Sequence, residues 1–461
     1  MTFPGITSPF IRAFGRKGQR PFDLSTTMIK RAESCAERMK EMYRCSENRM
    51  EDKISTFSKF GDAGHGGITR YSLSAEAVMA RNEFLKRMRA IGASIEIDDL
   101  ANLYATIPGS DPDAKRIVMA SHCDSVKNGG NYDGILGVMS AMEVLETVVE
   151  QDIPHRHPLT AMIWTNEEGS LYPPAMMCSG IVCYDYLPEN IRRNFRYEDM
   201  MRVKSVLDPT KTFGEALEES GFKGEKKYRL DPDRYLYMFE THIEQGPILE
   251  DAGNDIGVVD CVLGMFNYRI KFFGQTTHAG TFPMPKRKDA FFAAAQALCY
   301  LHEEIDGLGV SDLVYTTGEV VCHPCVHTCV PDYFDFSLDV RHEKPEVLQK
   351  VLDIVKRLAE RAWCGCTCEV EKRWNRDTVY WNKRLVNYVK EAAEECGVPH
   401  QYIHSGAGHD AQFASYMLPT TMIFVQSKDG LSHCEPEFSS VKHCTEGATV
   451  MLNAVLKADG D

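Results

Sequence analysis

A histidine and two aspartates lie among glycines in the segment SHCDSVKNGGNYDGILGV, which spans residues 121–138. His122 and Asp124 follow the apolar run RIVMA, which predicts a buried strand, and Asp133 falls in the loop after it. A carboxylate can fix the tautomer of an imidazole while the other ring nitrogen binds a metal ion. Taken alone, the segment also fits a solvated loop, because polar residues and glycines are typical of loops.

Two adjacent glutamates, Glu167 and Glu168, follow the next predicted strand in the segment AMIWTNEEGS. Side chains of neighbouring residues diverge, so one carboxylate can bind a metal ion while the other acts as a general base on water held there. The alternative is a pair of solvated surface charges.

Two further histidines also lie near the ends of predicted strands. His242 stands in YMFETHIEQGPILE, close to Gln245, and His433 stands in the segment TTMIFVQSKDGLSHCEPE. Each histidine alone fits an ordinary core or surface position. Together the candidates would hold two divalent ions with three protein ligands each, provided that Asp133 bridges the ions. The mixed nitrogen and oxygen donors suit Zn, with Mn, Co or Ni as substitutes. The five candidate ligands are His122, Asp133, Glu168, His242 and His433.

The elements that must position these side chains follow from an alternation of short apolar runs and longer helical ones, as in residues 116–121, 134–151 and 159–166. This alternation predicts an α/β fold with a mostly parallel sheet. Ligands of such sheets bind at the carboxyl ends of the strands, where the candidate residues lie.

A second region, residues 263–375, has a different pattern. It contains the period-two run YFDFSLDVR and the amphipathic run PEVLQKVLDIVKRLAERAW, which predict a strand and a helix. We therefore expect a compact α+β insert, with the main domain split into residues 1–262 and 376–461.

Composition narrows the function classes. The chain has 461 residues, 43% of them hydrophobic, which is enough for two domains. A net charge of −14 argues against nucleic acid and anionic membranes as partners. The first twenty residues lack the apolar centre of a signal peptide, and the 16 cysteines are expected to be reduced thiols, so we expect a cytoplasmic protein.

Six motifs in order together resemble the hydantoinase/carbamoylase family of di-metal amidases. This family includes N-carbamoyl-L-amino acid hydrolases, allantoate amidohydrolases and β-ureidopropionases. The resemblance runs from about Gly67 to the C-terminus and implies a di-zinc aminopeptidase-like catalytic domain interrupted by a smaller α+β lid and dimerisation domain. The motifs are SHCDSVKNGGNYDGILGV, NEEGS, HIEQGPILE, GQTTHAGTFPMPKRKDA, SGAGHDA and SHCEPE.

The resemblance also implies a role for each candidate residue. One metal ion would be bound by His122, Asp133 and His242, and the other by Asp133, Glu168 and His433. Glu167 would be the general base, Asp124 would orient His122, and Gln245 would help to hold the substrate.

Further candidate residues would lie nearer the substrate. The resemblance implies that His278 polarises the scissile carbonyl, often from the partner subunit, and that Arg341 binds a substrate carboxylate; a turn histidine and a pairing with Asp339 are the alternatives. Thr328 stands where the family commonly has Asn, which indicates an altered substrate pocket. In SGAGHDA, Gly406 and Gly408 would bring backbone N–H groups near the substrate, while His409 and Asp410 could cap the next helix.

The function implied is metal-dependent hydrolysis of a C–N bond in a linear amide or ureido compound, above all an N-carbamoyl amino acid or related ureido acid that bears a carboxylate. An N-acyl amino acid hydrolase or exopeptidase would use the same site, and a catalytically silent ligand-binding protein is the alternative of another class. We expect two divalent ions per chain, Zn before Mn, Co or Ni, and a homodimer. The cluster CHPCVHTC, residues 322–329, fits reduced cysteines better than a further metal site.

Overall fold

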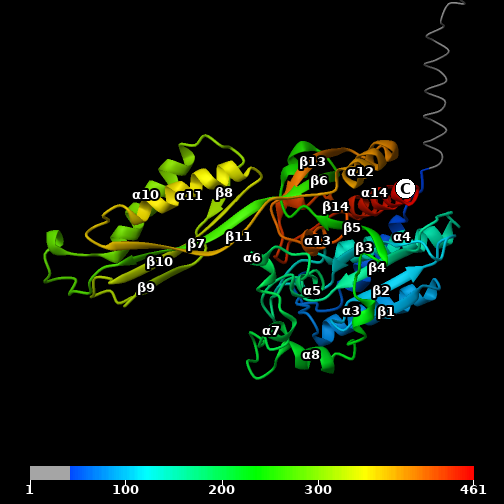
Figure 1. Ribbon diagram of the computed structural model, residues 1–461, viewed down its shortest axis with the longest axis horizontal. Helices are drawn as coiled ribbons and strands as arrows, with labels where there is room; N and C mark the ends of the chain where they lie inside the picture. The colour runs from blue at the N-terminus through cyan, green and yellow to red at the C-terminus, as the bar shows by residue number, and fades with distance from the viewer. Residues whose placement is uncertain (1–41) are drawn as a thin grey trace, which may run out of the picture. The chain divides into compact units, whose positions relative to one another are not determined.

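The structure is a computed structural model that describes residues 42–461. Most of the helices and nine of the strands belong to one large sheet and its covering layers (Figure 1). No helix of the described residues is both long and apolar enough to cross a membrane.

The large sheet has the order β1-β2-β4-β3-β5-β14-β6-β12, and β13 pairs with β6 off this path. Strands β3, β5 and β14 lie side by side in its middle (Figure 1). Strands β4 and β14 are buried along their whole length, as expected for apolar strands covered on both faces. The strands are β1 Ser94–Ile97, β2 Leu103–Ile107, β3 Arg116–His122, β4 Leu159–Trp164, β5 Tyr235–Ile243, β6 Ile256–Val262, β12 Val379–Tyr380, β13 His400–Ser405 and β14 Thr420–Val425.

The expectation of a mostly parallel sheet is right for the centre and wrong for the flanks. The pairs β4–β3, β3–β5, β5–β14 and β6–β13 are parallel. The pairs β1–β2, β2–β4, β14–β6 and β6–β12 are antiparallel. Only five residues separate β1 from β2, too few for the crossover that a parallel pair needs. The sheet is therefore mixed.

Helices cover this sheet and fix the loops at its carboxyl edge. Helix α4 packs on β3, β4 and β5, and α14 packs on α4, β5 and β14. Helix α2 packs on both α4 and α14. The helices of this part are α2 Glu47–Phe57, α3 Ala75–Ala90, α4 Ile135–Glu150, α5 Met177–Val182, α6 Glu189–Arg192, α7 Tyr197–Met200, α8 Phe213–Glu219, α9 Ile248–Ala252, α12 Lys383–Cys396, α13 Asp410–Ala414 and α14 Val441–Asp459.

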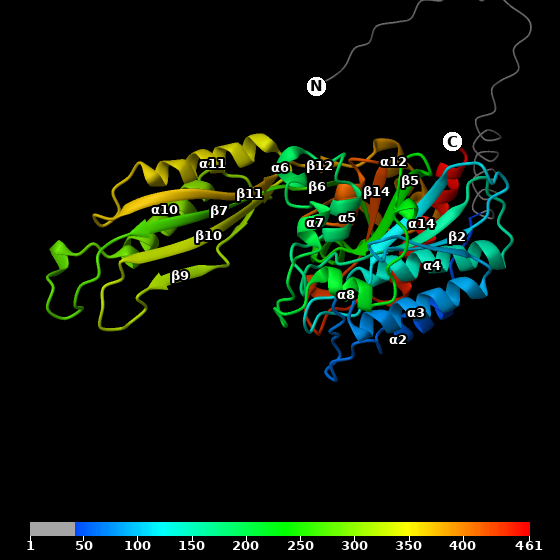
Figure 2. The same ribbon diagram turned by 60° about the horizontal axis from the view of Figure 1, so that its bottom comes forward.

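A second, five-stranded sheet is entirely antiparallel and has the order β11-β7-β10-β8, with β9 on β10. Helices α10 and α11 lie along this sheet (Figure 2) and share a hydrophobic cluster with it. The elements are β7 Gly264–Phe273, α10 Ala290–Asp306, β8 Val314–Thr316, β9 Val320–His323, β10 Tyr333–His342, α11 Pro345–Ala359 and β11 Thr367–Arg376.

The period-two pattern of β10 is confirmed, because Phe334, Phe336, Leu338 and Val340 all belong to the hydrophobic cluster. Helix α11 ends at Ala359 and not at Trp363, where the amphipathic pattern would place its end. The indole N–H of Trp363 donates to the carbonyl of Leu358 at 2.8 Å and its carbonyl accepts from the N–H of Cys366, so this residue closes a turn.

Candidate metal centre and active site

Five side chains converge at the carboxyl edge of the large sheet. His122 ends β3, His242 lies next to the end of β5, and the other three stand in loops that follow β3, β4 and β14. The two oxygens of Asp133 face different partners. Oδ1 lies 3.5 Å from Nε2 of His122 and 3.4 Å from Nε2 of His242, whereas Oδ2 lies 3.3 Å from Nε2 of His433.

These atoms form two groups that share Asp133. In each group the donor atoms all lie within 4.8 Å of one another; the groups are His122, Asp133 and His242, and Asp133, Glu168 and His433. The Asp133 distances exceed those of ordinary hydrogen bonds, but two ligands about 2.1 Å from one tetrahedral ion stand about 3.4 Å apart. Oε1 of Glu168 is buried without a hydrogen-bond partner and lies 3.8 Å from Nε2 of His433. The residues therefore fit two divalent cations.

The far nitrogens of two histidines are anchored by backbone carbonyls. Nδ1 of His122 lies 3.0 Å from the carbonyl oxygen of Asp124, and Nδ1 of His242 lies 2.9 Å from that of Ile243. A proton on each Nδ1 leaves Nε2 as the nitrogen that can bind a metal ion, and in His242 this Nε2 accepts the N–H of Gly134 at 3.2 Å.

The carboxylate of Asp124 has a different partner from the one expected. It lies 3.7 Å from Nδ1 of His122, but it accepts the N–H groups of Glu167 at 3.3 Å and Glu168 at 3.2 Å. Asp124 thus orients His122 through its backbone and holds the two glutamates through its side chain.

Two residues that the sequence did not single out hold Asp133 in place. Oε1 of Glu437 accepts the backbone N–H groups of Tyr132 at 2.9 Å and Asp133 at 3.0 Å. Gly134 has φ +64°, and a Cβ added there would lie 2.2 Å from ring atoms of His122. Glu437 stands in the SHCEPE motif, yet nothing in its spacing indicates a contact with a loop 300 residues earlier.

The carboxylates of the site titrate far from their ordinary range. Burial raises the pKa of Glu167 well above its usual value, against the opposing charge of His122, and burial raises the pKa of Glu168 to about 7. Burial would also raise the pKa of Asp133, but His242 and the other two histidines lower it well below the usual value. Such a concentration of acid in a buried site is typical of a place that holds cations.

Glu167 lies beside the two ligand groups without belonging to either. Its Oε2 is 3.7 Å from Nε2 of His122. The residue is buried, and the neighbouring carboxylates of Asp410 and Glu168 further favour its protonated form by raising its pKa. A carboxyl group in such surroundings can accept and return a proton.

A cavity of about 470 Å³ adjoins the ligands and is lined by Gln245, Arg341, Gly406 and His433, among others. Nε2 of Gln245 donates to Oδ2 of Asp133 at 2.6 Å, and Gln245 and His433 have φ of +60° and +57°. Left-handed backbone at non-glycine residues is strained and clusters at functional sites.

Arg341 makes the pairing with Asp339 that the sequence left open as an alternative, and its binding of a substrate carboxylate stays a prediction. Its Nε donates to Asp339 at 2.8 Å, and one terminal nitrogen donates to the carbonyl of Gly406 at 2.6 Å. The guanidinium nevertheless lines the cavity beside His433.

His278 and Thr328 lie on two neighbouring loops of the second sheet, one after β7 and one after β9. His278 is exposed, and the N–H of Ala279 donates to the carbonyl of Thr328 at 2.8 Å. Nδ1 of His278 accepts the N–H groups of Gly280 and Thr281 at 3.0 and 3.2 Å, so the ring proton sits on Nε2. Within residues 42–461, no hydrogen bond or ion pair joins either residue to the metal ligands.

The expected helix cap in SGAGHDA is wrong. His409 is the N-cap residue of α13, but its side chain makes no capping bond. Its Nε2 lies 2.9 Å from Oγ of Ser405, and its ring contacts that of His242 with centroids 4.6 Å apart. Asp410 accepts a hydrogen bond from Ser179. Both residues are buried, and His409 packs against the candidate ligand His242.

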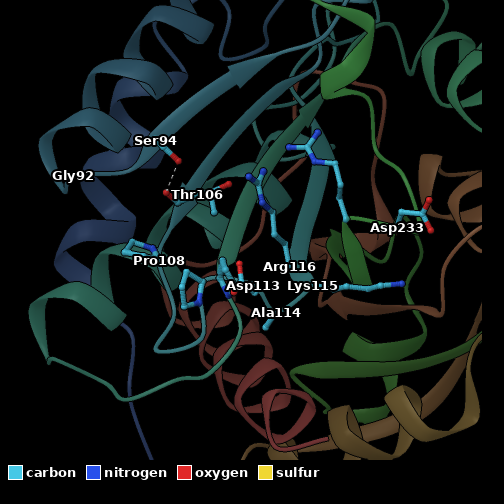
Figure 3. Close-up of a pocket in the computed structure, with 12 residues that line it drawn as sticks. Gly92, Ser94, Thr106, Pro108, Asp113, Ala114, Lys115, Arg116 and Asp233 are labelled. Carbon is cyan, nitrogen blue, oxygen red and sulfur yellow. Dashed lines mark hydrogen bonds between the residues drawn. The ribbon is translucent and has the colours of Figure 1, made fainter.

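Two other features lie away from this centre. Among residues 42–461, no group of three possible ligand atoms within 4.8 Å includes the cysteine-rich segment 322–329. A cavity of about 640 Å³, lined by Lys115, Arg116 and Asp233 among others, lies where β3 begins, at the opposite edge of the sheet (Figure 3).

Several known proteins are similar to this chain in sequence and in fold. Residues 118–457 match the model of Peptidase family M20/M25/M40. An N-carbamoyl-L-amino-acid amidohydrolase of Rhizobium meliloti is 32% identical, covering 90% of this chain and 97% of its own length. An allantoate amidohydrolase of Bacillus subtilis is 30% identical over 89% of this chain and 97% of its own length. The crystal structure of a hydantoinase/carbamoylase family amidase from Burkholderia multivorans has 34% identity and a TM-score of 0.81, covering 91% of this chain and 99% of the other.

Proposed function

Because the chain belongs to the hydantoinase/carbamoylase amidases of peptidase family M20/M25/M40, we propose that it hydrolyses the C–N bond of an N-carbamoyl amino acid or a related ureido acid. Membership of this family confirms the resemblance of the six motifs. The observation that carries the proposal is the pair of ligand groups that share Asp133 beside the buried Glu167. Relatives named as amidohydrolases of N-carbamoyl amino acids and of allantoate support the ureido class of substrate.

We propose that the two ligand groups hold two divalent ions, with Zn as the first candidate. The donors support this choice, because imidazole nitrogens and carboxylate oxygens suit Zn, and Mn, Co and Ni accept the same donors. When bound, such ions supply Lewis-acid polarisation of a carbonyl and of a water molecule.

The protein's own residues would then have separate roles in the reaction. Glu167 takes a proton from the attacking water and returns it to the leaving nitrogen, a role that its burial and position beside His122 support. Arg341 and Gln245 would hold the substrate in the cavity of about 470 Å³ that they line. Gly408 would be a further contact from the loop of Gly406, and Thr328, on the loop beside His278, would be one where that loop reaches an active site. For a ureido acid the products are an amine, carbon dioxide and ammonia.

We further propose that residues 263–375 form a lid and dimerisation domain, with residues 1–262 and 376–461 as the catalytic domain. A separate sheet and a separate hydrophobic cluster support this division. His278, with its proton on the exposed Nε2, would reach the site of a partner subunit and donate to the developing oxyanion. A cytoplasmic location goes with this proposal, since reduced thiols are typical there.

A substrate panel with the full-length chain tests the function. The protein is stripped with a chelator, reconstituted with Zn, Mn or Co, and assayed on N-carbamoyl, N-acyl and dipeptide substrates. We expect no turnover without metal, and release of ammonia and free amino acid from the N-carbamoyl substrates once metal is restored.

Each other outcome selects a different function. Release of amino acids from dipeptides or N-acyl amino acids alone would replace the carbamoylase assignment with a peptidase or acylase. Tight binding of ureido acids without turnover under any metal would indicate a ligand-binding protein. Full activity of the metal-free chain would contradict the metal centre itself.

A further inference from the structure

Arg376, the last residue of β11, has no anionic partner. Among residues 42–461 no carboxylate lies within ion-pair distance of its guanidinium, although the side chain is partly buried. The hydrogen-bond acceptor that it has is Sδ of Met176, at 3.9 Å. A thioether is a weak acceptor, so a partly desolvated cation here lacks the partner that would stabilise it most.

Aromatic rings hold this guanidinium in a fixed place. Its carbon lies 5.3 Å from the ring centre of Phe413 and 5.8 Å from that of Trp374. One terminal nitrogen stands 3.3 Å from where a Cβ on Gly408 would be. Arg376 therefore lies against the glycine loop that borders the active site.

Gln412 lies on the same side of Gly408 and is a second unpartnered polar group. The residue is 1% exposed, and neither its Nε2 nor its Oε1 has a hydrogen-bond partner. Its Oε1 lies 3.5 Å from the Cβ position on Gly408. A buried amide with both ends unsatisfied is rare and costly, and it is the kind of group that a polar ligand satisfies.

Met176 now occupies the space between these groups. Its methyl carbon is 3.1 Å from the Cβ position on Gly408, and its sulfur is the atom that Arg376 contacts. Methionine is flexible and adapts its packing readily, so its side chain can make room for a ligand group. Gly408 itself leaves no side chain in the way.

The loop of Gly406 and Gly408 connects Arg376 with the cavity beside the candidate ligands, because Gly406 lines that cavity and Arg376 lies against Gly408. Burial lowers the pKa of Arg376, the charge of Glu167 opposes this shift, and Arg341 adds to it. The two arginines contact the same loop at different points, Arg341 at the carbonyl of Gly406 and Arg376 at Gly408. Arg341 is already paired with Asp339, whereas Arg376 is free among the described residues.

We infer that Arg376 and Gln412 form a subsite for a second carboxylate of the substrate, so that the enzyme prefers dianionic ureido acids, that is, N-carbamoyl derivatives of acidic amino acids. This inference rests on the proposed function. One carboxylate would bind at Arg341 and the other would accept hydrogen bonds from the guanidinium of Arg376 and the amide of Gln412.

The test compares isosteric substrates that differ only in charge. Metal-loaded full-length chain is assayed for amino acid release from N-carbamoyl-L-glutamate against N-carbamoyl-L-glutamine, and from N-carbamoyl-L-aspartate against N-carbamoyl-L-asparagine. We expect wild type to favour the acid of each pair at least tenfold in kcat/KM. In Arg376→Gln this ratio should fall about 10- to 100-fold, the loss of a charged hydrogen bond.

Two further variants separate binding from structure. Gln412→Met should lower the same ratio several-fold without lowering Tm, since the amide has no partner to lose. Arg373→Gln is the matched control, because Arg373 lies on the same strand and pairs with Glu319 at 3.2 Å; it should leave rates and ratios unchanged. Equal losses on acid and amide substrates in Arg376→Gln, or no preference in wild type, would overturn the subsite.

A binding measurement tests the subsite independently of the proposed hydrolytic function. Calorimetry in the Glu167→Gln background measures the Kd of N-carbamoyl-L-glutamate and N-carbamoyl-L-glutamine with and without Arg376→Gln. Preferential binding of the dianion, lost with Arg376, supports the subsite even if wild type hydrolyses no carbamoyl compound. Absence of any preference contradicts the subsite, whether or not the enzyme is a carbamoylase.

Discussion

Glu167 and Glu168 are neighbours in the chain, but their carboxylates face different atoms. Oε2 of Glu167 lies 3.7 Å from Nε2 of His122, and Oε1 of Glu168 lies 3.8 Å from Nε2 of His433. Asp124 accepts the N–H groups of both and so fixes the turn from which they diverge. One peptide unit thus separates the proposed general base from the proposed metal ligand.

Exchanging each carboxylate for an amide tests this division. We expect Glu167→Gln to retain its metal ions and to lose about 10²- to 10⁴-fold in kcat, because an amide cannot take the proton. Glu168→Gln should instead lose metal affinity by about 10- to 100-fold, a loss of the size seen when residues that support metal ligands are replaced. Metal content by elemental analysis and kcat under saturating metal measure the two effects. Reversed phenotypes would exchange the two assignments.

At the residue scale, the functional residues that could be predicted from the sequence were those at or just after the end of a predicted strand. His122 and Glu168 stood out because they follow apolar runs whose carboxyl ends meet at one edge. The contacts of His409 with His242 and of Glu437 with Asp133 were missed, because they arise from packing between distant segments. Arg376 was missed for a related reason, because the sequence does not show which arginines lack an acidic partner in the folded protein.

At the scale of elements, the start of α4 positions the carboxylate of Asp133, which belongs to both candidate ligand groups. Asp133 precedes Gly134, the N-cap of α4, whose φ of +64° turns the chain back against the ring of His122. Nδ1 of that ring is held at 3.0 Å from the carbonyl of Asp124, so the ring cannot move aside. The turn at Gly134 and the orientation of the His122 ring therefore depend on each other.

Gly134→Ala should disrupt the centre by adding one methyl group. The left-handed conformation costs about 1–2 kcal/mol for a residue with a Cβ, and the clash with His122 adds to this cost. We expect at least a tenfold loss of metal affinity in a chelator titration. Gly397→Ala is the control, since Gly397 has φ +66° at the end of α12 with nothing within 4 Å of an added Cβ. Equal metal loss in both variants would show that only backbone strain matters.

Helix α4 is in turn fastened to α2 by a buried ion pair. Nζ of Lys53 donates to Glu143 at 2.6 Å, and both side chains are fully buried. Burial would raise the pKa of Glu143, but Arg49 and Lys53 hold it below its usual value. Because the folded-state pKa is lowered, this stabilisation is complete above the unfolded value of 4.5 and is lost as pH falls through the folded value.

Lys53→Met should therefore destabilise the protein by about 3 kcal/mol, because it leaves Glu143 buried with one cation fewer. Urea unfolding at pH 7 measures the loss. Adding Glu143→Leu to the same chain should recover part of it, since an apolar pair needs no counter-charge. If Lys53→Met had no effect at pH 7, the pair would contribute nothing to the attachment of α4.

The mixed sheet shows where element-level prediction stops. The strands β3, β4 and β10 and the helices α4 and α11 were predicted from periodicity, because each contains in its own residues the apolar run or face that it buries. The direction of β6 relative to β14 depends on how the chain returns from the second sheet. That return spans more than a hundred residues, so no local pattern reports it.

At the scale of the whole molecule, the proposed reaction needs a residue that the chain's own site does not supply. His278 has its proton on an exposed Nε2, and its hydrogen bonds are to its own loop. A second copy of the chain is the source that we propose for this donor. The assembly would then be part of the chemistry and not only of stability.

Mixing two inactive variants tests this shared site. His278→Ala chains and Glu167→Gln chains should each be nearly inactive, and their mixture should regain up to about a quarter of wild-type activity, the share expected if subunits combine at random in dimers and each site draws on both. Size-exclusion chromatography with light scattering measures the assembly in parallel. A fully active monomer, or a mixture no better than its parts, would contradict the shared site.

The five-stranded sheet is connected to the rest of the chain through two strands that pair with each other. Val262 of β6 stands opposite Val379 of β12, and Cys261 stands opposite Tyr380. The chain thus leaves and returns at one place, and whatever lies between these points can lengthen, shorten or be exchanged without altering the register of β6. Substitutions in the inserted segment can therefore change its surface and its contacts while the strands that carry the candidate ligands keep their positions.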